Sequence, residues 1–441
     1  MQQQLAEIQS IVEDVLKLAK EKGATQAEAS MSKVEGIAVS SRLKEVETVE
    51  FTNDGGLGIT VYHGKKKGSA STADLSPKAL KITVEKAIEI AKHTGDDDCS
   101  GLAEKELMAF EFPDLDLFHP VELDTELAIQ QVIATETSAL NVDPRITNSD
   151  GASYNANLGT KVYGNSHGLL AGYNSSRYSM SCVLIGEQDG EMQRDYSYSV
   201  GREAGMLTSP EQLGLEAAQF TLGRLGARKV KTCQVPVLFD REIAAGLFGH
   251  FISAISGGSL YRKSSFLLDK LGQQVLPNWL NITERPHILR GLASSPFDHE
   301  GVKTQDMDII SNGLLNHYLL TSYSARKLNM QTTGHAGGIH NWFIQHSGHT
   351  DKEMLAKLGT GLLVTELMGQ GVNIVTGDYS RGAAGFWVEN GAIQYPVHEI
   401  TIAGNLADML MNIVAIGAVQ ENRGSIQTGS VLIESMQIAG E

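Results

Sequence analysis

Residues 240–258 read D-R-E-I-A-A-G-L-F-G-H-F-I-S-A-I-S-G-G, and this run predicts a helix around which the C-terminal part of the chain is organised. Asp240 suits the N-cap, and Glu242 places negative charge in the first turn, where the helix dipole favours it. Gly257 and Gly258 predict the C-terminal stop. The apolar residues leave hardly any polar face, which predicts burial in the core. They are Ile243, Leu247, Phe248, Phe251, Ile252 and Ile255.

His250 is the one ionisable residue in the middle of this helix. A zinc peptidase helix needs a second histidine one turn later and a glutamate beside the first histidine as general base. Here Phe251 occupies the base position, and Ala254 and Ile255 occupy the two second-ligand positions. One imidazole cannot hold a catalytic zinc, so we expect His250 to be a core histidine hydrogen-bonded to backbone. The sequence of this helix therefore predicts that the metal site of such a helix is vacant here, with neither a complete ligand set nor a catalytic residue.

Length and composition predict a cytoplasmic protein. A chain of 441 residues predicts two or three domains, and a 41% hydrophobic share is ordinary for a globular protein. We find no run of roughly 20 apolar residues that could span a membrane and no signal peptide. The three cysteines, Cys99, Cys182 and Cys233, are too dispersed for a disulfide framework or a cysteine zinc site. A net charge of −16 argues against binding to nucleic acid or to an acidic membrane.

The N-terminal part alternates between helical and strand periodicity. We predict an α+β fold in which two similar helix–strands–helix units, residues 1–115 and 116–228, precede a β-rich domain at 229–441 wrapped on the helix quoted above. In the first unit the strands are expected to turn at the N-D-G-G sequence, residues 53–56, and at residues 65–67. Ser76-Pro77 and Ser209-Pro210 predict helix starts. In the C-terminal domain, Asn312-Gly313 and Asn390-Gly391 predict hairpins.

Two further motifs suggest chemistry that we do not expect. Gly164 to Gly168 matches G-x-S-x-G, but the following residues predict strand and turn, so a tight hairpin explains the glycines better than a serine nucleophile. His335, His340, His346 and His349 lie within fifteen residues, with no acidic residue before Asp351. Their Gly-rich spacing predicts an exposed loop with adventitious metal binding at most. We therefore expect no metal cofactor in this chain.

The run from Gly377 to Gly385, G-D-Y-S-R-G-A-A-G, predicts a tight loop. Its small residues permit close backbone approach, and three polar side chains stand just before a predicted strand. An internal pair between Asp378 and Arg381 would explain the loop structurally. Alternatively, Asp378, Ser380, Arg381 and Gly382 contact a substrate or a partner. The sequence leaves both interpretations open.

Several long segments together resemble the PmbA/TldE branch of the TldD/PmbA metalloprotease family. They are G-H-F-I-S-A-I-S-G-G-S-L-Y-R-K-S-S-F-L-L, T-T-G-H-A-G-G-I-H-N, T-G-D-Y-S-R-G-A-A-G-F-W-V-E-N-G, Y-P-V-H-E-I-T-I-A-G-N-L and R-G-S-I-Q-T-G-S-V-L-I-E. The resemblance covers nearly the whole chain. It implies that TldD-type relatives carry an H-E-x-x-x-H helix and a C-terminal cysteine ligand. Matched to that pattern, this chain has His250, Phe251 and Ile255, and residues 420–424 offer no cysteine.

The resemblance further implies a subunit that pairs with a zinc-bearing TldD-type protein to cleave unfolded peptides, such as a microcin precursor or an antitoxin. We expect the isolated chain to be inactive and able to form a homodimer. Two alternatives remain: a self-sufficient hydrolase that uses another site, and a non-enzymatic interaction protein such as a regulator of a DNA-acting enzyme. Activity of the isolated, metal-free chain would separate the first alternative from the family expectation.

Overall fold

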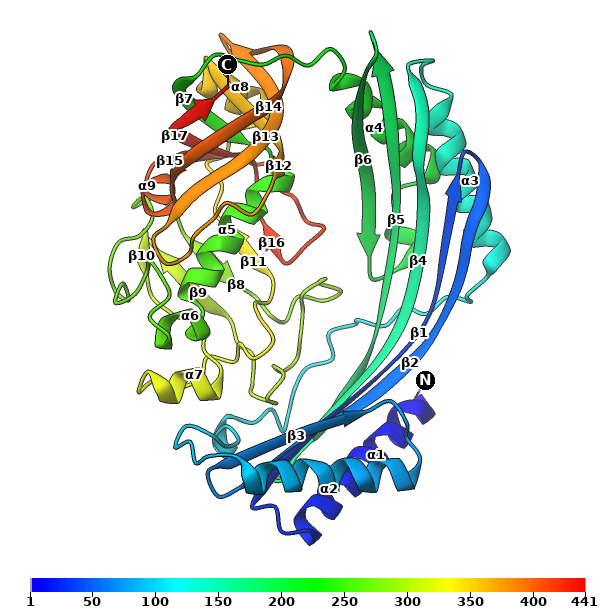
Figure 1. The fold of residues 1–441 in the computed structure, drawn as a ribbon, viewed down its shortest axis with the longest axis vertical. Helices are drawn as coiled ribbons and strands as arrows, with labels where there is room; N and C mark the ends of the chain where they lie inside the picture. The colour runs from blue at the N-terminus through cyan, green and yellow to red at the C-terminus, as the bar shows by residue number, and fades with distance from the viewer. Residues whose placement is uncertain (1, 441) are drawn as a thin grey trace.

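A computed structural model, which describes residues 2–440, shows a mixed α/β protein with a long curved sheet beside a second, β-rich body (Figure 1). The curved sheet has the strand order β3-β2-β1-β4-β5-β6, and every neighbouring pair in it is antiparallel. Its strands are β1 (Gln26–Arg42), β2 (Glu45–His63), β3 (Lys66–Thr72), β4 (Ile146–Asn165), β5 (Leu170–Gln188) and β6 (Glu191–Gly201). The strands of the two N-terminal units thus form one continuous sheet.

Four helices cover one face of this sheet: α1 (Gln2–Glu21), α2 (Pro77–His93), α3 (Thr125–Leu140) and α4 (Pro210–Gly223). The alternation of side chains along β1 explains why. Ala27, Ala29 and Met31 are buried under α1 and α2. Ile37 and Val39 are also odd-numbered, so they point to the same face of β1, where α3 and α4 cover them. Ser30 and Ser32 point to the opposite, polar face, which is turned toward the C-terminal body.

The turn that joins β1 to β2 is not where the sequence predicted it. Asn53 to Gly56 lie inside β2, and the chain turns at Leu43 and Lys44, both of which have positive φ. The buried carboxylate of Glu136 on α3 accepts the two backbone N–H groups of this turn, at 2.7 and 2.8 Å. A side chain 92 residues away from Lys44 therefore stabilises a turn that lacks glycine.

The C-terminal body contains two further sheets. One has the order β14-β13-β12-β7-β17-β15 and the other the order β10-β9-β8-β11-β16. The strands are β7 (Cys233–Phe239), β8 (Ile282–Glu284), β9 (Met307–Ser311), β10 (Leu314–Leu315), β11 (Trp342–Ile344), β12 (Gly361–Met368), β13 (Asp378–Glu389), β14 (Ala392–Asn405), β15 (Ile413–Ile416), β16 (Ile426–Gln427) and β17 (Val431–Ala439). The hairpins expected at Asn312-Gly313 and Asn390-Gly391 are confirmed as β9–β10 and β13–β14.

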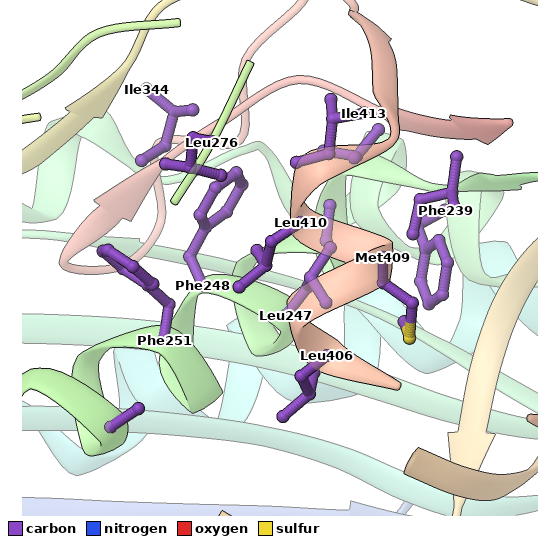
Figure 2. Packing of buried hydrophobic residues seen from close by; sticks show 14 of the residues in the cluster. Phe239, Leu247, Phe248, Phe251, Leu276, Ile344, Leu406, Met409, Leu410 and Ile413 are labelled. Carbon is purple, nitrogen blue, oxygen red and sulfur yellow. The ribbon is translucent and has the colours of Figure 1, made fainter. Parts of the chain in front are cut away.

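Helix α5 (Arg241–Ile255) shares one hydrophobic core with strands of both sheets, and Figure 2 shows several of its side chains in that core. Leu247, Phe248 and Phe251 pack with Leu410 of α9 and with Leu276 in one buried cluster. The remaining helices are short: α6 (Gly257–Tyr261), α7 (Ser322–Lys327), α8 (Asp351–Leu358) and α9 (Leu406–Met411), with 3-10 turns at Lys105–Leu107 and Ala204–Met206. The sequence predicted that Gly257 and Gly258 only end α5, but both residues form the start of α6.

Two negative findings bear on the function. No helix among residues 2–440 combines the length and apolar character needed to cross a bilayer. The G-x-S-x-G sequence spans the end of β4 and the turn to β5, and the Ser166 hydroxyl accepts the backbone N–H of Ala27 at 3.0 Å. This serine has a structural bond on a hairpin and not the strand-to-helix setting of a nucleophile.

Candidate functional site

Helix α5 begins as the sequence predicts but is not buried on all sides. The Asp240 carboxylate accepts the backbone N–H of Glu242 at 3.0 Å and caps the helix. Gly246 and Ser253 are exposed, and His250 on the same side is only partly buried. The expectation of a core histidine bonded to backbone is therefore wrong. No hydrogen bond to this imidazole is present among residues 2–440, and its ring meets Tyr379 edge-on at 6.0 Å.

The residues on α5 do not fit a zinc ion. Phe251, Ala254 and Ile255, which stand at the base and second-ligand positions, are all 0% exposed and belong to the hydrophobic core. Phe251 packs against Trp342 of β11 with 6.4 Å between ring centroids. Burial, and secondarily the nearby charge of Arg381, lowers the pKa of His250. A lone imidazole beside a guanidinium offers a cation no complete ligand set.

The segment at residues 420–424, where the family resemblance places a cysteine, carries an ion-pair network. Arg423 hydrogen-bonds to Glu421 and to Glu242 at the start of α5, and it donates to the Tyr198 carbonyl of β6 at 2.8 Å. Its guanidinium also lies 4.0 Å from the centroid of the Tyr198 ring. This arginine thus joins α5 to the curved sheet, and it places positive charge where a metal ligand would otherwise be sought.

The sequence predicted a tight loop containing Asp378, Ser380, Arg381 and Gly382, and this prediction is wrong. They are the first residues of strand β13, paired with β14 from Asp378↔Asn405 onward. The small residues at 382–385 serve close strand packing, because a Cβ at Gly385 would lie 1.9 Å from the Leu363 carbonyl of β12. Alternation then separates the four residues: Arg381 shares a face with Tyr379, whereas Asp378 and Ser380 lie on the other, exposed face.

Arg381 is consequently the one of these four that approaches α5. No Asp378–Arg381 ion pair forms among the described residues, because Thr376 donates to Asp378 at 2.6 Å and the guanidinium interacts with Tyr379. Burial raises the pKa of Tyr379 to about 12, against the effect of the Arg381 charge. Within residues 2–440 the buried Nε of Arg381 has no hydrogen-bond acceptor. The Nε itself is closed to an external ligand, but Arg381 as a whole is partly exposed and places its positive charge near His250. A guanidinium of this kind can donate to a carbonyl or a carboxylate.

A cleft lies on the polar face of the curved sheet, where it meets the segment 298–300 of the C-terminal body. It measures about 630 Å³, and an adjoining hollow of about 440 Å³ continues it. Their shared lining includes Ser30, Gly58, Ser71, Tyr163 and His299. Hydroxyl groups on a sheet face suit the backbone of an extended peptide, and the volume falls in the range of binding pockets. Sequence reasoning missed this cleft because its two walls are about 140 to 270 residues apart in the chain.

The titratable groups around the cleft are strongly perturbed. Burial raises the pKa of Glu28 although Tyr163 donates to its carboxylate at 2.9 Å, and burial lowers the pKa of Lys161. Burial, followed by the charge of Glu300, raises the pKa of Asp298 to about 7, while three backbone N–H groups act in the opposite direction. Desolvated ionisable groups with perturbed pKa values are typical of binding sites.

We expect the change in the free energy of unfolding caused by Glu28→Gln to be more favourable at pH 8 than at pH 4. A raised carboxyl pKa means that stability is fully present below the unfolded-state pKa and is lost as the pH rises through the folded-state pKa. The amide of the variant cannot ionise, yet its oxygen can still accept the hydrogen bond that the Tyr163 hydroxyl donates to Glu28. Urea unfolding of both proteins at the two pH values measures the difference.

Glu35→Gln is the matched control, because Lys33 and Gln4 hydrogen-bond to Glu35 and lower its pKa. Its stability contribution is present above the unfolded-state pKa, so the control should lose stability at pH 8 relative to pH 4. Equal effects of Glu28→Gln at both pH values would contradict the prediction.

The histidine-rich stretch is only partly the exposed loop that the sequence predicted. His346 is exposed, but His335 and His340 are 5% and 6% exposed and converge on Glu284, which is 0% exposed. Glu284 lies on β8, 51 residues before His335, so the missing carboxylate comes from a distant strand. One potential ligand atom from each of the three residues lies within 4.8 Å of the others.

Three family models match successive parts of the chain. Family models match at residues 27–91 (PmbA/TldA metallopeptidase domain 1), 118–225 (PmbA/TldA metallopeptidase central domain) and 232–440 (PmbA/TldA metallopeptidase C-terminal domain). Metalloprotease PmbA of Escherichia coli O157:H7 is 57% identical over 434 residues, which cover 98% of this chain and 96% of that protein.

Solved structures agree on the fold. A Bacteroides thetaiotaomicron protein, described as a candidate modulator of DNA gyrase, is similar with a TM-score of 0.94 at 26% identity over 99% of both chains. TldE from Thermococcus kodakarensis is similar with a TM-score of 0.84 at 20% identity, covering 98% of this chain and 100% of that one. At that identity the second similarity concerns the fold alone.

Proposed function

Because the chain belongs to the PmbA/TldD metallopeptidase family, we propose that it is the non-catalytic, PmbA/TldE-like subunit of a heteromeric zinc protease. A TldD-type subunit would hold the zinc, and the assembly would degrade or process unfolded peptides of the microcin-precursor or antitoxin type in the cytoplasm. The observation that carries the proposal is the packing of α5. Phe251 and Ile255 fill the base and second-ligand positions as fully buried core residues.

The role of this chain would be to bind and orient the substrate and to complete the protease. The cleft on the curved sheet offers hydroxyl groups and ionisable side chains to an extended peptide, and the partly exposed Arg381 offers a guanidinium. Both features bind polar backbone groups without requiring a nucleophile. The net charge of −16 disfavours direct contact with nucleic acid or with an acidic membrane.

We expect a stable complex with a TldD-type protein and peptide cleavage only by that complex. A chain that keeps the helix but lacks the ligands needs a partner to supply the base and the metal. Tagged protein should co-purify with the partner from cells that express both, and the complex should cleave an unfolded peptide while this chain alone, as a monomer or homodimer, does not.

Two outcomes would refute the proposal. Cleavage by the isolated chain after chelator treatment would indicate a self-sufficient hydrolase that uses another site. A complete failure to assemble with the TldD-type protein, with both chains folded, would favour an independent interaction or regulatory protein.

A further inference from the structure

The cluster of Glu284, His335 and His340 is a buried group of titratable side chains separate from the cleft and from helix α5. Trp342 on β11 lies directly opposite Glu284 on β8, and its indole N–H donates to the Glu284 carboxylate at 3.2 Å. The backbone N–H of His340 donates to the same oxygen at 2.5 Å. The second carboxylate oxygen lies 2.6 Å from His335 Nε2. Strand pairing thus fixes the carboxylate, and the loop before β11 delivers both imidazoles to it.

A buried carboxylate in this setting requires a positive counterpart. Glu284 has no exposed surface, so water cannot offset the charge of its carboxylate. No lysine or arginine pairs with Glu284 among residues 2–440, and His335 and His340 are the basic side chains that contact it. Either an imidazolium or a bound cation must balance this charge.

The surroundings of the two imidazoles match those of metal ligands. His335 Nδ1 lies 2.8 Å from the Thr333 hydroxyl, so a second hydrogen bond orients the ring and leaves Nε2 facing the carboxylate. Metal-ligating histidines are held in this manner. His340 Nδ1 lies 3.4 Å from the other carboxylate oxygen. Two imidazole nitrogens and one carboxylate are donors that suit zinc and similar divalent transition ions.

We propose that Glu284, His335 and His340 form a structural binding site for a divalent transition-metal ion of the zinc type. This site is separate from helix α5, which lacks a set of metal-ligating residues. The ion would be held by one ligand atom of each residue. It would tie β8 to the loop before β11. The same loop supports the cleft, because the Ala336 carbonyl accepts the His299 N–H at 2.8 Å and Gly337 packs on the His299 ring. This site departs from the sequence-based expectation of a metal-free chain.

Cobalt(II) is a suitable probe, since its visible spectrum reports coordination. The full-length chain, freed of its affinity tag and stripped with a chelator, should bind about one Co²⁺ with a nitrogen- and oxygen-ligand spectrum that Zn²⁺ abolishes. Metal should also raise the unfolding temperature of the isolated chain. His335→Ala and His340→Ala should each weaken binding by roughly 100-fold or more, by analogy with losses on perturbing metal ligation.

His346→Ala and His250→Ala are matched controls that should leave binding unchanged, because one histidine is exposed in the same stretch and the other lies on α5. Circular dichroism confirms that each variant is folded. Less than stoichiometric Co²⁺ in the wild-type chain overturns the proposal, as does wild-type binding that survives in both folded His335→Ala and His340→Ala. The wild-type titration decides the matter if a variant fails to fold. No partner or activity enters this test, so its failure leaves the proposed function untouched.

Discussion

We expect Phe251→Ala to lower the free energy of unfolding of the C-terminal body by about 3–5 kcal/mol. The side chain is 0% exposed, lies between the two C-terminal sheets and contacts the Trp342 ring. Its removal loses the transfer free energy of the ring and leaves a cavity among residues that cannot collapse freely, because both sheets constrain them. Figure 2 shows the ring among Phe248, Leu276 and Ile344, which would line that cavity.

Tryptophan fluorescence during urea unfolding measures this loss, because Trp279, Trp342 and Trp387 all lie in the C-terminal body. Phe220→Ala on α4 is the matched control: that ring is 49% exposed on a helix, and its loss should change stability by no more than about 0.5 kcal/mol. Phe251→Leu should cost roughly 1–2 kcal/mol, since it keeps most of the volume. A loss below about 1 kcal/mol for Phe251→Ala would mean that the base position is not part of the core.

The same packing explains why a general base cannot be restored by one substitution. Phe251→Glu would place a carboxylate at a position with no exposed surface and no partner, which is at least as destabilising as the cavity. Phe251 occupies the base position and packs against Trp342, which donates to Glu284. The apolar residue at this position of α5 is therefore part of the packing of the core.

Local signals in the sequence predicted the element starts well. Asp240 caps α5, and Ser76 and Ser209 cap the two helices that begin with proline, each by accepting a backbone N–H. These contacts involve residues two or three positions apart, which a sequence pattern can reveal. The N-D-G-G run failed as a turn because the pairing of β1 with β2 and the distant Glu136 carboxylate outweigh glycine's local preference.

The site residues depend on contacts that no local pattern contains. Residues 378–385 read as a loop because they are small and polar, yet pairing with β12 and β14 makes them strand, and the strand then divides Arg381 from Asp378. His335 and His340 read as exposed because glycines surround them. Glu284 joins them only through the pairing of β8 with β11, in which Trp342 lies opposite Glu284 at a separation of 58 residues that the sequence does not specify.

The second large effect concerns where peptide cleavage takes place. In a complex with a TldD-type partner, replacing the glutamate of the partner's metal helix should lower turnover by roughly 100-fold to 10,000-fold, because a general base is lost. His250→Ala in this chain should leave kcat within a few-fold of the wild-type value. The His250 ring has no hydrogen bond in residues 2–440 and only an edge contact with Tyr379. Its loss should affect packing and not the attacking water.

Arg381→Ala should act differently from both, by raising KM with kcat nearly unchanged. Loss of a charged hydrogen bond to bound peptide is worth about 1.5–3 kcal/mol, or roughly a 10- to 100-fold rise. Asp378→Ala is the control, because Asp378 lies on the opposite face of β13 and should leave KM unaltered. The measurement is peptide cleavage by each reconstituted complex, normalised to assembled complex. Abolished turnover with His250→Ala in a well-assembled complex would show that α5 of this chain takes part in catalysis, since the packing role assigned to His250 cannot produce that loss.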